Sequence, residues 1–382
     1  MRVLSISPAA RGGICQYTHG LCSSLATHDL DLILLTAADN TEIDYFHPRY
    51  RVVKELSPRA HSTWWRNITA FGHDFKTLKH WVAAYHPDIV HFQAFSHPRR
   101  DSHIISWLAG QGIRVCHTAH HLLPYRSSRR QHELYARLYR QCQGLFAHTE
   151  ESAHELVSRF GINPRRLTLI PHGNFFHLTG VNPAMTTSEA RGLLGLDPED
   201  FCVLFFGALV PYRGIDTILR AMSHLKVYPR VKLLLAGRPG WDQLENAIDM
   251  LKIRDSVILY PDYIPIRYVG QYFNAANLVA LPYRDAYSGS SIILSYSFGR
   301  PVISTRAGGV PEILSNRSDG FLVKPNDTED LARALREAYL LPAHELSAMG
   351  QHALSLAQTR HAWPSIASAT LTAYRRWLAA GL

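Results

Sequence analysis

The feature that most constrains the fold of this chain is the alternation of short apolar segments with longer amphipathic stretches. In the first half, the segments predicted as strands are residues 3–7, 32–36, 89–92, 115–118, 145–147 and 167–170. The stretches with helical periodicity are residues 14–27, 64–84, 102–110, 131–141 and 151–160. Strands that are apolar on both faces are typical of a parallel sheet covered by helices. This half is therefore predicted to form a doubly wound α/β domain of the Rossmann-like kind.

The pattern is interrupted once and then starts again. Residues 175–189 are polar and punctuated by Gly and Pro, which is typical of a linker. Predicted strands follow at residues 202–206, 231–236, 257–260, 278–281, 302–304 and 321–323, with helices at 215–225, 243–251, 266–274, 291–298 and 330–340. The predicted domains are residues 1–175 and 190–360, followed by a C-terminal helical segment, 361–382. Two such domains in tandem would face a central cleft, where small ligands usually bind.

Composition excludes several classes of protein. The 382 residues are 46% hydrophobic and 19% charged, and this length favours two domains. No segment approaches the roughly 18–20 unbroken apolar residues of a membrane-spanning helix, and the first apolar run is too short for a signal peptide. The five cysteines form no CxxC pair, which favours buried free thiols in a reducing compartment. We therefore expect a cytoplasmic protein.

The formal net charge of +9 favours contact with anions. The Lys and Arg residues form no long run and are too dispersed for a groove that follows a nucleic-acid backbone, so nucleic acid is not expected as a partner. Phosphorylated substrates account for the charge.

Glycine-containing turns between a strand and a helix are predicted to hold phosphate. Gly12 and Gly13 follow the first strand. Because glycine has no side chain, a bound group can approach the backbone there, near a helix N-terminus. A plain tight turn is the alternative. Gly207 ends the first strand of the second domain, and Arg213 precedes the next helix. Its guanidinium can bind two oxygens of a diphosphate, the alternative being an ordinary surface arginine.

A further turn, Ser288-Gly289-Ser290-Ser291, also joins a strand to a helix. Successive backbone amides in such a turn form a nest for an anion, and the hydroxyls can bind phosphate or ribose. An ordinary helix N-cap, which needs only one Ser, is the alternative. Residues 299–312, with Gly308 and Gly309, would flank the same pocket.

In the first domain, His120 and Gln93 follow predicted strands, whose carboxyl ends face the ligand crevice in open α/β sheets. His120 is predicted to hydrogen bond a sugar hydroxyl or to act as a base, although most of the 22 His residues are expected to be structural. His91 is predicted to pack at a strand end, whereas Gln93 is predicted to face the cleft and the acceptor.

The order of these motifs resembles that of the bacterial GT-B glycosyltransferases numbered family four, or glycosyltransferase group 1. The motifs are Gly12-Gly13, FFGALVPYRG, LPYRDAYSGSS and GRPVISTRAGGVPE, and the resemblance covers nearly the whole chain. It implies two Rossmann-like domains and a metal-independent enzyme without a cofactor. The implied donor is a nucleotide-diphosphate-sugar, with UDP or GDP favoured, held mainly by the second domain. A final helix that crosses back to the first domain is also implied.

The resemblance implies a role for each matching residue. The phosphate-contacting positions and the loops that approach the diphosphate match Arg213, Ser288, Gly289, Ser290, Ser291, Gly12, Gly13 and Gly207. Tyr263 and Ile264 match the loop whose backbone meets the nucleotide base, and His120 matches the histidine near the donor sugar. The implied function is transfer of a hexose-type sugar to a saccharide or lipid-linked saccharide acceptor, in bacterial polysaccharide or glycoconjugate synthesis.

The sequence departs from the family at a pair of Glu residues that would fall on Ala286 and Leu294. In the family the first Glu lies beside the transferred sugar and the second usually holds the ribose; this chain resembles a branch that lacks the pair. Asp285 is the predicted catalytic substitute, and the stereochemical outcome is left open. Two alternatives remain: an enzyme like the nucleotide-sugar 2-epimerases, which share the architecture but need acidic catalytic residues, and a non-catalytic nucleotide-sugar-binding subunit, which the missing Glu pair keeps open.

The predicted helix 64–84 is aromatic and basic, and it begins with Trp64 and Trp65. Aromatic faces stack on sugars, and aromatic-basic helices also lie on anionic membranes. We therefore predict that this helix contacts the acceptor or, peripherally, the inner face of a bacterial membrane. A packing helix with a solvated basic side is the alternative.

Overall fold

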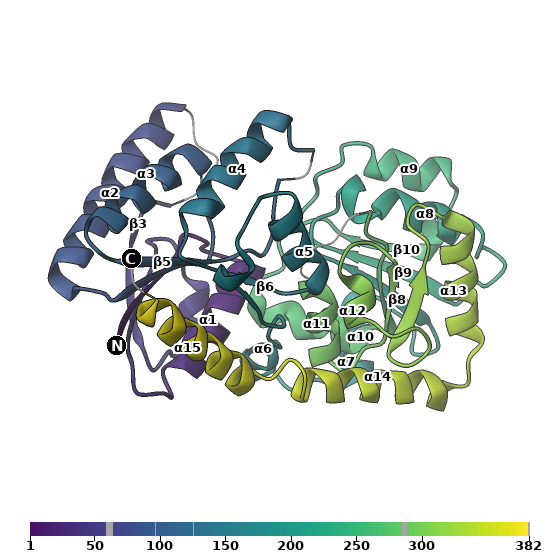
Figure 1. Ribbon diagram of the computed structural model, residues 1–382. Helices are drawn as coiled ribbons and strands as arrows, with labels where there is room; N and C mark the ends of the chain where they lie inside the picture. The colour runs from purple at the N-terminus through teal and green to yellow at the C-terminus, as the bar shows by residue number, and fades with distance from the viewer. Residues whose placement is uncertain (59–63, 96, 125, 285–288, 381–382) are drawn as a thin grey trace. The chain divides into compact units, whose positions relative to one another are not determined.

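The computed structural model describes residues 1–58, 64–95, 97–124, 126–284 and 289–380. They form two compact units. Unit 1 consists of Met1–Gly173 together with Ala362–Leu382, and unit 2 consists of Asn174–His361. Each unit is a parallel sheet covered by helices, as the alternating sequence pattern predicts (Figure 1).

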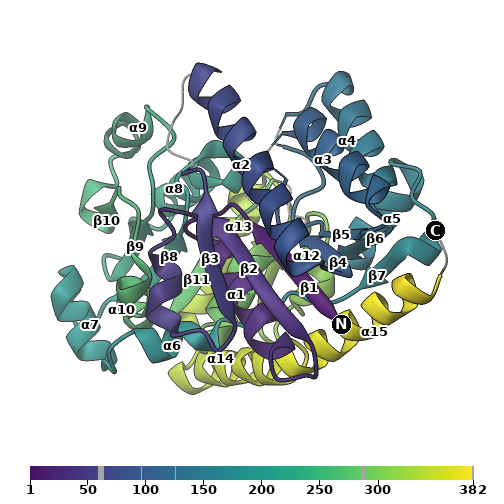
Figure 2. The ribbon, with the colours of Figure 1, turned by 90° about the vertical axis from the view of Figure 1, so that its left-hand side faces the viewer.

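The sheet of unit 1 has the strand order β3-β2-β1-β4-β5-β6-β7. Its strands are β1 (Arg2–Ser7), β2 (Asp31–Ala37), β3 (Arg51–Leu56), β4 (Ile89–Phe92), β5 (Arg114–Thr118), β6 (Gly144–Ala147) and β7 (Leu167–Leu169). All neighbours are parallel, and β1 pairs with β2 on one side and β4 on the other. Figure 2 shows β3, β2 and β1 side by side. The sequence pattern missed β3 because this edge strand carries charged side chains and is only partly buried.

The helices of unit 1 connect these strands, except the last helix, which follows unit 2 in the sequence. They are α1 (Gly13–Leu25), α2 (Trp64–Tyr85), α3 (Pro98–Gly110), α4 (Arg129–Gln141), α5 (Glu150–Ser158) and α15 (Trp363–Ala379), with short 3-10 turns at η1 (Glu42–Phe46) and η2 (Pro164–Arg166). The start of α4 is fixed by a capping box, in which the Ser128 side chain accepts from the backbone of Gln131 and the Gln131 side chain accepts from Ser128.

The helix α15 belongs to the core of unit 1, although it is the last helix of the chain. It packs against α1, and its buried side chains include Tyr374 and Trp377. The indole of Trp377 lies where a Cβ of Gly144 would be, only 2.4 Å from that position. Tyr374 makes a 2.6 Å hydrogen bond with Nδ1 of His91, which is fully buried. These contacts attach residues 362–380 to the sheet of unit 1.

The sheet of unit 2 has the strand order β10-β9-β8-β11-β12-β13, again with parallel neighbours. Its strands are β8 (Phe201–Phe206), β9 (Val231–Ala236), β10 (Val257–Tyr260), β11 (Leu278–Leu281), β12 (Val302–Thr305) and β13 (Gly320–Val323). All six were predicted from the sequence to within one residue at each end.

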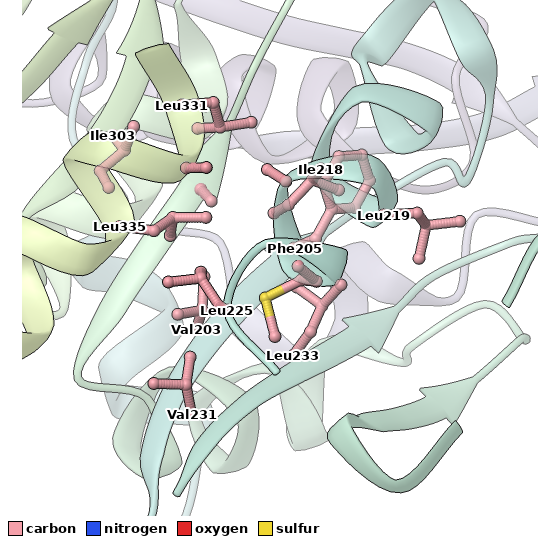
Figure 3. Close-up of a cluster of buried hydrophobic side chains, with 14 of the residues drawn as sticks. Val203, Phe205, Ile218, Leu219, Leu225, Val231, Leu233, Ile303, Leu331 and Leu335 are labelled. Carbon is pink, nitrogen blue, oxygen red and sulfur yellow. The ribbon is translucent and has the colours of Figure 1, made fainter. Parts of the chain in front are cut away.

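Helices of unit 2 are α6 (Phe176–Val181), α7 (Thr187–Leu194), α8 (Ile215–Ser223), α9 (Leu244–Met250), α10 (Val269–Ala275), α11 (Ser290–Ser297), α12 (Val310–Ile313), α13 (Thr328–Leu340) and α14 (Ala343–Gln358). Short 3-10 turns lie at η3 (Pro211–Arg213), η4 (Arg254–Ser256) and η5 (Ile266–Tyr268). The core lies between the sheet and the packed pair α8 and α13. Figure 3 shows Val203, Phe205 and Leu233 of the sheet meeting Ile218 of α8 and Leu335 of α13.

The segment predicted as a linker, residues 175–189, is instead part of unit 2 and contains α6 and the start of α7. Thr186 and Glu189 form a capping box that starts α7. Asn182 accepts a 2.6 Å hydrogen bond from the backbone of Gly270 and donates one to Leu178. The polar residues that suggested a linker are therefore helix caps and side chains that hydrogen bond one short helix to another.

All five cysteines are buried and free, which confirms the prediction of buried thiols.

Candidate functional site

The strand order of unit 2 reverses between β8 and β11, which are neighbours in the sheet but not in sequence. In open parallel sheets, ligands bind beyond the carboxyl ends of the strands at such a switch point. Gly207 follows β8 directly, and Tyr283 and Arg284 follow β11. The sequence-predicted donor motifs therefore lie at the place where the topology favours a ligand.

Arg213 connects the two loops at this switch point. It lies in η3, after β8, and its Nη2 donates to the Tyr283 hydroxyl at 3.0 Å and to Ser291 Oγ at 2.9 Å. Its Cζ lies 5.4 Å from the centroid of the Tyr283 ring. Among the described residues, its side-chain partners are hydroxyls, and it forms no ion pair with a carboxylate there. The structure thus joins Arg213 and Ser291, which come from two separate motifs, and adds Tyr283.

Gly207 is needed for this arrangement. Its φ of 110° lies in a region that favours glycine, and an added Cβ would be 2.1 Å from Arg213 Nη1. Any side chain at this position would push the guanidinium away from Tyr283 and Ser291.

The turn before α11 supplies backbone donors to the same place. Gly289 is the N-cap of α11, with a φ of 59°, and Ser290 and Ser291 are its first two residues. The first N–H groups of a helix have no partner inside it, and the helix dipole favours an anion there. Ser288 and Asp285, also predicted here, lie outside the described residues, as does Ala286. Leu294 is buried on α11, 7% exposed, so this position packs in the core.

Arg284 differs from Arg213 in its partners. Its Nη2 lies 2.5 Å from Asp216 Oδ2, and Asp216 also pairs with Arg220 at 2.7 Å. Asp216 lies in the first turn of α8, where a carboxylate is favourable. The carboxylate neutralises much of the positive charge of Arg284, which leaves Arg213 as the stronger candidate for an anion contact.

Tyr263 and Ile264, the predicted base-contacting residues, lie in the loop after β10 and are half-buried. The Tyr263 backbone N–H donates to Asp262 Oδ1 at 2.6 Å. Arg238, which follows β9, places its Cζ 5.8 Å from the centroid of the Tyr263 ring. Sequence reasoning missed Arg238, although its position after a strand was a usable signal.

In unit 1 the strand order reverses between β1 and β4; Gly12 lies in the loop after β1, and Gly13 is the first residue of α1. Gly12 has a φ of 79°, and no atom lies within 4 Å of where its Cβ would be, so the backbone is open on that side. Its N–H donates to Glu42 Oε2 at 3.1 Å. A carboxylate therefore already occupies one amide of this predicted phosphate loop, which the sequence did not indicate because Glu42 is 30 residues away.

His120 lies in a buried aromatic cluster with His148, His172 and Tyr17. The centroid of its ring is 4.5 Å from that of Tyr17, and its Nδ1 is 3.0 Å from His148 Nε2. Burial, together with the neighbouring His148 and His172, holds the pKa of His120 well below its ordinary value. His120 is therefore neutral at physiological pH. Among the described residues, no group of three or more His, Cys, Asp or Glu is arranged to hold a metal ion.

Gln93, predicted to face the acceptor, is fully buried after β4. Its Nε2 lies 3.5 Å from Ser5 Oγ and 3.2 Å from His91 Nδ1. This burial rules out a membrane contact through Gln93, and its role toward an acceptor stays a prediction. His91 hydrogen bonds Tyr374 and Thr118 and is a packing residue, as expected.

Trp64 and Trp65 begin α2, but their side chains lie outside the described residues. Further along α2, Lys79 Nζ lies 4.3 Å from the centroid of the Phe75 ring, which itself packs edge-on against Trp107 of α3. Part of the aromatic and basic surface of α2 is thus used in packing against α3. Of the helices that the structure describes, none is both long enough and apolar enough to span a membrane.

Two family models match the chain. Residues 11–173 match the model described as Glycosyltransferase Family 4, and residues 187–354 match the model described as Glycosyl transferases group 1. The two matches do not overlap, and together they span most of the chain.

Similar proteins carry related descriptions. The D-inositol 3-phosphate glycosyltransferase of Segniliparus rotundus is 28% identical over 322 residues, which are 77% of this chain and 69% of that protein. The protein of the same name from Gordonia bronchialis is 26% identical over 400 aligned residues, 96% of this chain and 84% of that protein.

Solved structures share the fold. Sucrose-phosphate synthase from Thermosynechococcus elongatus matches with a TM-score of 0.80 and 20% identity over 100% of both chains. HepE from Anabaena, solved with UDP and glucose, matches with a TM-score of 0.78 and 17% identity over 97% of this chain and 98% of that chain.

Proposed function

Because the chain belongs to the group 1 glycosyltransferases, with a family 4 N-terminal unit and the GT-B fold, we propose that it transfers a hexose-type sugar from a UDP-sugar or GDP-sugar to a saccharide or polyol acceptor. It is an enzyme that uses a nucleotide-sugar donor, as this family does. The names of its relatives favour a small phosphorylated polyol, of the inositol phosphate kind, over a lipid-linked saccharide as the acceptor.

The observation that carries the donor proposal is the position of Arg213 at the switch point of the unit 2 sheet. Its guanidinium is held by two neutral hydroxyls, those of Tyr283 and Ser291, which orient the guanidinium without cancelling its charge. The start of α11 adds backbone N–H groups beside it. A cation and a helix N-terminus together suit a diphosphate, whose oxygens can accept from both. Ser288 would complete this nest.

The nucleotide base is proposed to lie at the loop after β10. Tyr263 offers an aromatic face there, and Arg238 lies over that ring. A purine or pyrimidine could hydrogen bond the backbone of Tyr263 and Ile264, which would select the nucleotide.

In unit 1, we propose that His120 contacts the transferred sugar as a neutral imidazole, since burial keeps the pKa of His120 low. The pair of Glu residues that the family resemblance implies would fall here on Ala286 and on the buried Leu294. Asp285 stays the proposed acidic group. Metal-independent transfer is likewise part of the proposal, in which Arg213 and the helix N-terminus offset the charge of the leaving diphosphate.

A panel of donors tests this proposal. The protein is mixed with UDP-, GDP- and ADP-sugars, and thermal stabilisation and slow release of nucleoside diphosphate are measured, without acceptor and with inositol phosphate, a saccharide or a lipid-linked saccharide. Stabilisation by one donor with acceptor-dependent release supports the proposal. Stabilisation without any release, for every donor and acceptor, would instead indicate a binding subunit, and a change of the sugar on the intact donor would indicate an epimerase.

The first prediction concerns Arg213. Arg213→Ala should weaken binding of the nucleoside diphosphate by roughly tenfold to a hundredfold, because charged hydrogen bonds contribute about 1.5–3 kcal/mol each. The affinity of Arg213→Lys should lie between those of the wild type and Arg213→Ala, since an ammonium keeps the charge but cannot form two parallel hydrogen bonds as a guanidinium does. Titration calorimetry measures both.

Arg220→Ala is the matched control for this prediction. Arg220 is a half-exposed arginine on α8 whose partner is Asp216, and its loss should leave nucleotide affinity unchanged. Equal affinities of wild type and Arg213→Ala would remove Arg213 from the site.

A further inference from the structure

Three groups at the ends of neighbouring strands in unit 1 form a hydrogen-bonded chain. Ile170 follows β7, His148 follows β6, and His120 follows β5, and these strands are adjacent in the sheet. His148 Nδ1 lies 3.2 Å from the backbone oxygen of Ile170, and His148 Nε2 lies 3.0 Å from His120 Nδ1. The carbonyl thus connects to His120 through a single imidazole.

The chemistry of these groups determines the direction of each bond. A carbonyl oxygen only accepts, so His148 Nδ1 must carry the proton. His148 is 7% exposed, and a neutral imidazole has one N–H. Its Nε2 is then a lone pair, which can only accept, and His120 Nδ1 must be the donor. A neutral His120 with its proton on Nδ1 has a lone pair on Nε2.

That nitrogen of His120 is free to act on a ligand. His120 Nε2 is buried, and no hydrogen-bond partner exists for it among the residues that the structure describes. The ring is held by the edge-on contact with Tyr17, whose centroid is 4.5 Å away, and by the bond to His148. A buried nitrogen with a lone pair and no partner is suited to a hydroxyl donor.

We infer that His148 is a positioning residue that sets the tautomer of His120, so that His120 Nε2 accepts a hydrogen bond from a hydroxyl group of the bound sugar. The part that concerns the sugar rests on the proposed function. The tautomer itself does not, because it follows from the contacts of Ile170, His148 and His120 with His148 as a neutral imidazole. The opposite tautomer would make Nε2 a donor and would select a carbonyl, carboxylate or phosphate oxygen instead.

The tautomer is measurable in the full-length protein. With ¹⁵N-labelled histidine, two-bond ¹H–¹⁵N correlation spectra distinguish a protonated from an unprotonated ring nitrogen, and the signals missing in His120→Gln assign His120. The expected result is a protonated Nδ1 and an unprotonated Nε2 at neutral pH. A proton on Nε2 of His120 in the wild-type protein would overturn the inference.

Variants of His148 separate positioning from packing. His148→Phe keeps the ring volume but removes the acceptor, so the spectrum of His120 should no longer show a proton on Nδ1 alone. His148→Gln, whose amide oxygen can accept from His120, should retain it. His172→Phe is the control, because His172 also packs on Tyr17 but hydrogen bonds Gly173 through its Nδ1. A change in the His120 pattern with His172→Phe, or none with His148→Phe, counts against the inference.

Activity provides a second readout. His148→Phe should lower kcat for sugar transfer by about tenfold or more while the Kd for nucleoside diphosphate stays within about twofold, since Arg213 and the start of α11, which carry the donor proposal, belong to unit 2. Equal kcat values of wild type and His148→Phe would overturn the part that concerns the sugar. If the wild type turns over no donor, the proposed function fails, and the wild-type spectrum still decides the tautomer.

Discussion

Arg213 and Arg284 lie at the same edge of the unit 2 sheet, but their neighbours give them different chemistry. Arg284 faces the carboxylate of Asp216, whereas the partners of Arg213 are the hydroxyls of Tyr283 and Ser291. A hydroxyl orients a guanidinium without cancelling its charge. The side chain that can attract a diphosphate is therefore identified by its partners, because residue type alone does not distinguish the two arginines.

Buried neutral histidines are a second feature at this scale. Burial lowers the pKa of His91 to about 3, well below its ordinary value of 6.5, with a smaller contribution from His117. Burial likewise lowers the pKa of His117 to about 3. In the unfolded chain both would take up a proton near pH 6.5, so acid favours the unfolded state.

The resulting prediction is a stability that falls with acid between pH 6.5 and about 3. The stability contributed by neutral His91 is fully present above pH 6.5 and is lost progressively as the pH falls toward 3, at up to about 1.4 kcal/mol per pH unit. His91→Gln should flatten the pH dependence of the free energy of unfolding by about that amount. Urea unfolding from about pH 6 to about pH 4 measures it. The exposed His154→Gln should keep the wild-type slope, and an unchanged slope in His91→Gln would contradict the prediction.

At the scale of elements, the segment between the two sequence patterns is informative. Its Gly, Pro and polar residues indicated a linker, but Asn182 connects the end of α6 to the start of α10, and the capping box of Thr186 starts α7. Short helices stabilised by side-chain caps lack the long amphipathic periodicity by which helices are recognised in sequences.

Asn182→Ala should lower the free energy of unfolding of unit 2 by about 1–3 kcal/mol, because the buried N–H of Gly270 loses its acceptor. Asn182→Asp keeps an acceptor oxygen and should cost less. Chemical denaturation followed by circular dichroism tests both variants. A wild-type stability for Asn182→Ala would show that residues 175–189 behave as a linker after all.

At the scale of the whole molecule, unit 1 is built from both ends of the chain. The helix α15 contributes Ile366, Tyr374 and Trp377 to a core shared with α1 and the first strands. The glycine at position 144 leaves room for the Trp377 indole, and Phe146 packs edge-on against it at 5.0 Å between centroids. Unit 1 cannot complete its core until α15 has been made.

Trp377→Ala should therefore destabilise unit 1 by about 3–5 kcal/mol, as is typical of a buried aromatic side chain reduced to a methyl group. Limited proteolysis with mass spectrometry should show cleavage gained within residues 1–173, whereas unit 2 stays protected. Arg375→Ala, on the exposed side of the same helix, is the control and should behave as wild type. Equal loss of protection in both units would mean that α15 stabilises the chain as a whole.

The sequence by itself determined the type and order of most elements, the parallel sheets and the placement of the phosphate motifs at strand ends. It could do so because hydrophobic periodicity is local, and because parallel strands bring their carboxyl ends to one edge. It identified Gly207, Arg213 and Ser291, which the structure brings together, and His120, whose cluster it did not anticipate.

Only the tertiary structure decided which groups face those residues. Glu42 occupies the amide of Gly12, His148 holds His120, and α15 completes a core more than 200 residues away. The edge strand β3 was not predicted because its partly exposed residues show no apolar periodicity. Such facts depend on contacts between distant segments, and these contacts depend on how side chains pack across neighbouring strands. Hydrophobic periodicity along the chain does not encode that packing. The carboxyl ends of predicted strands nevertheless indicate where candidate site residues lie, as His148 and Arg238 illustrate.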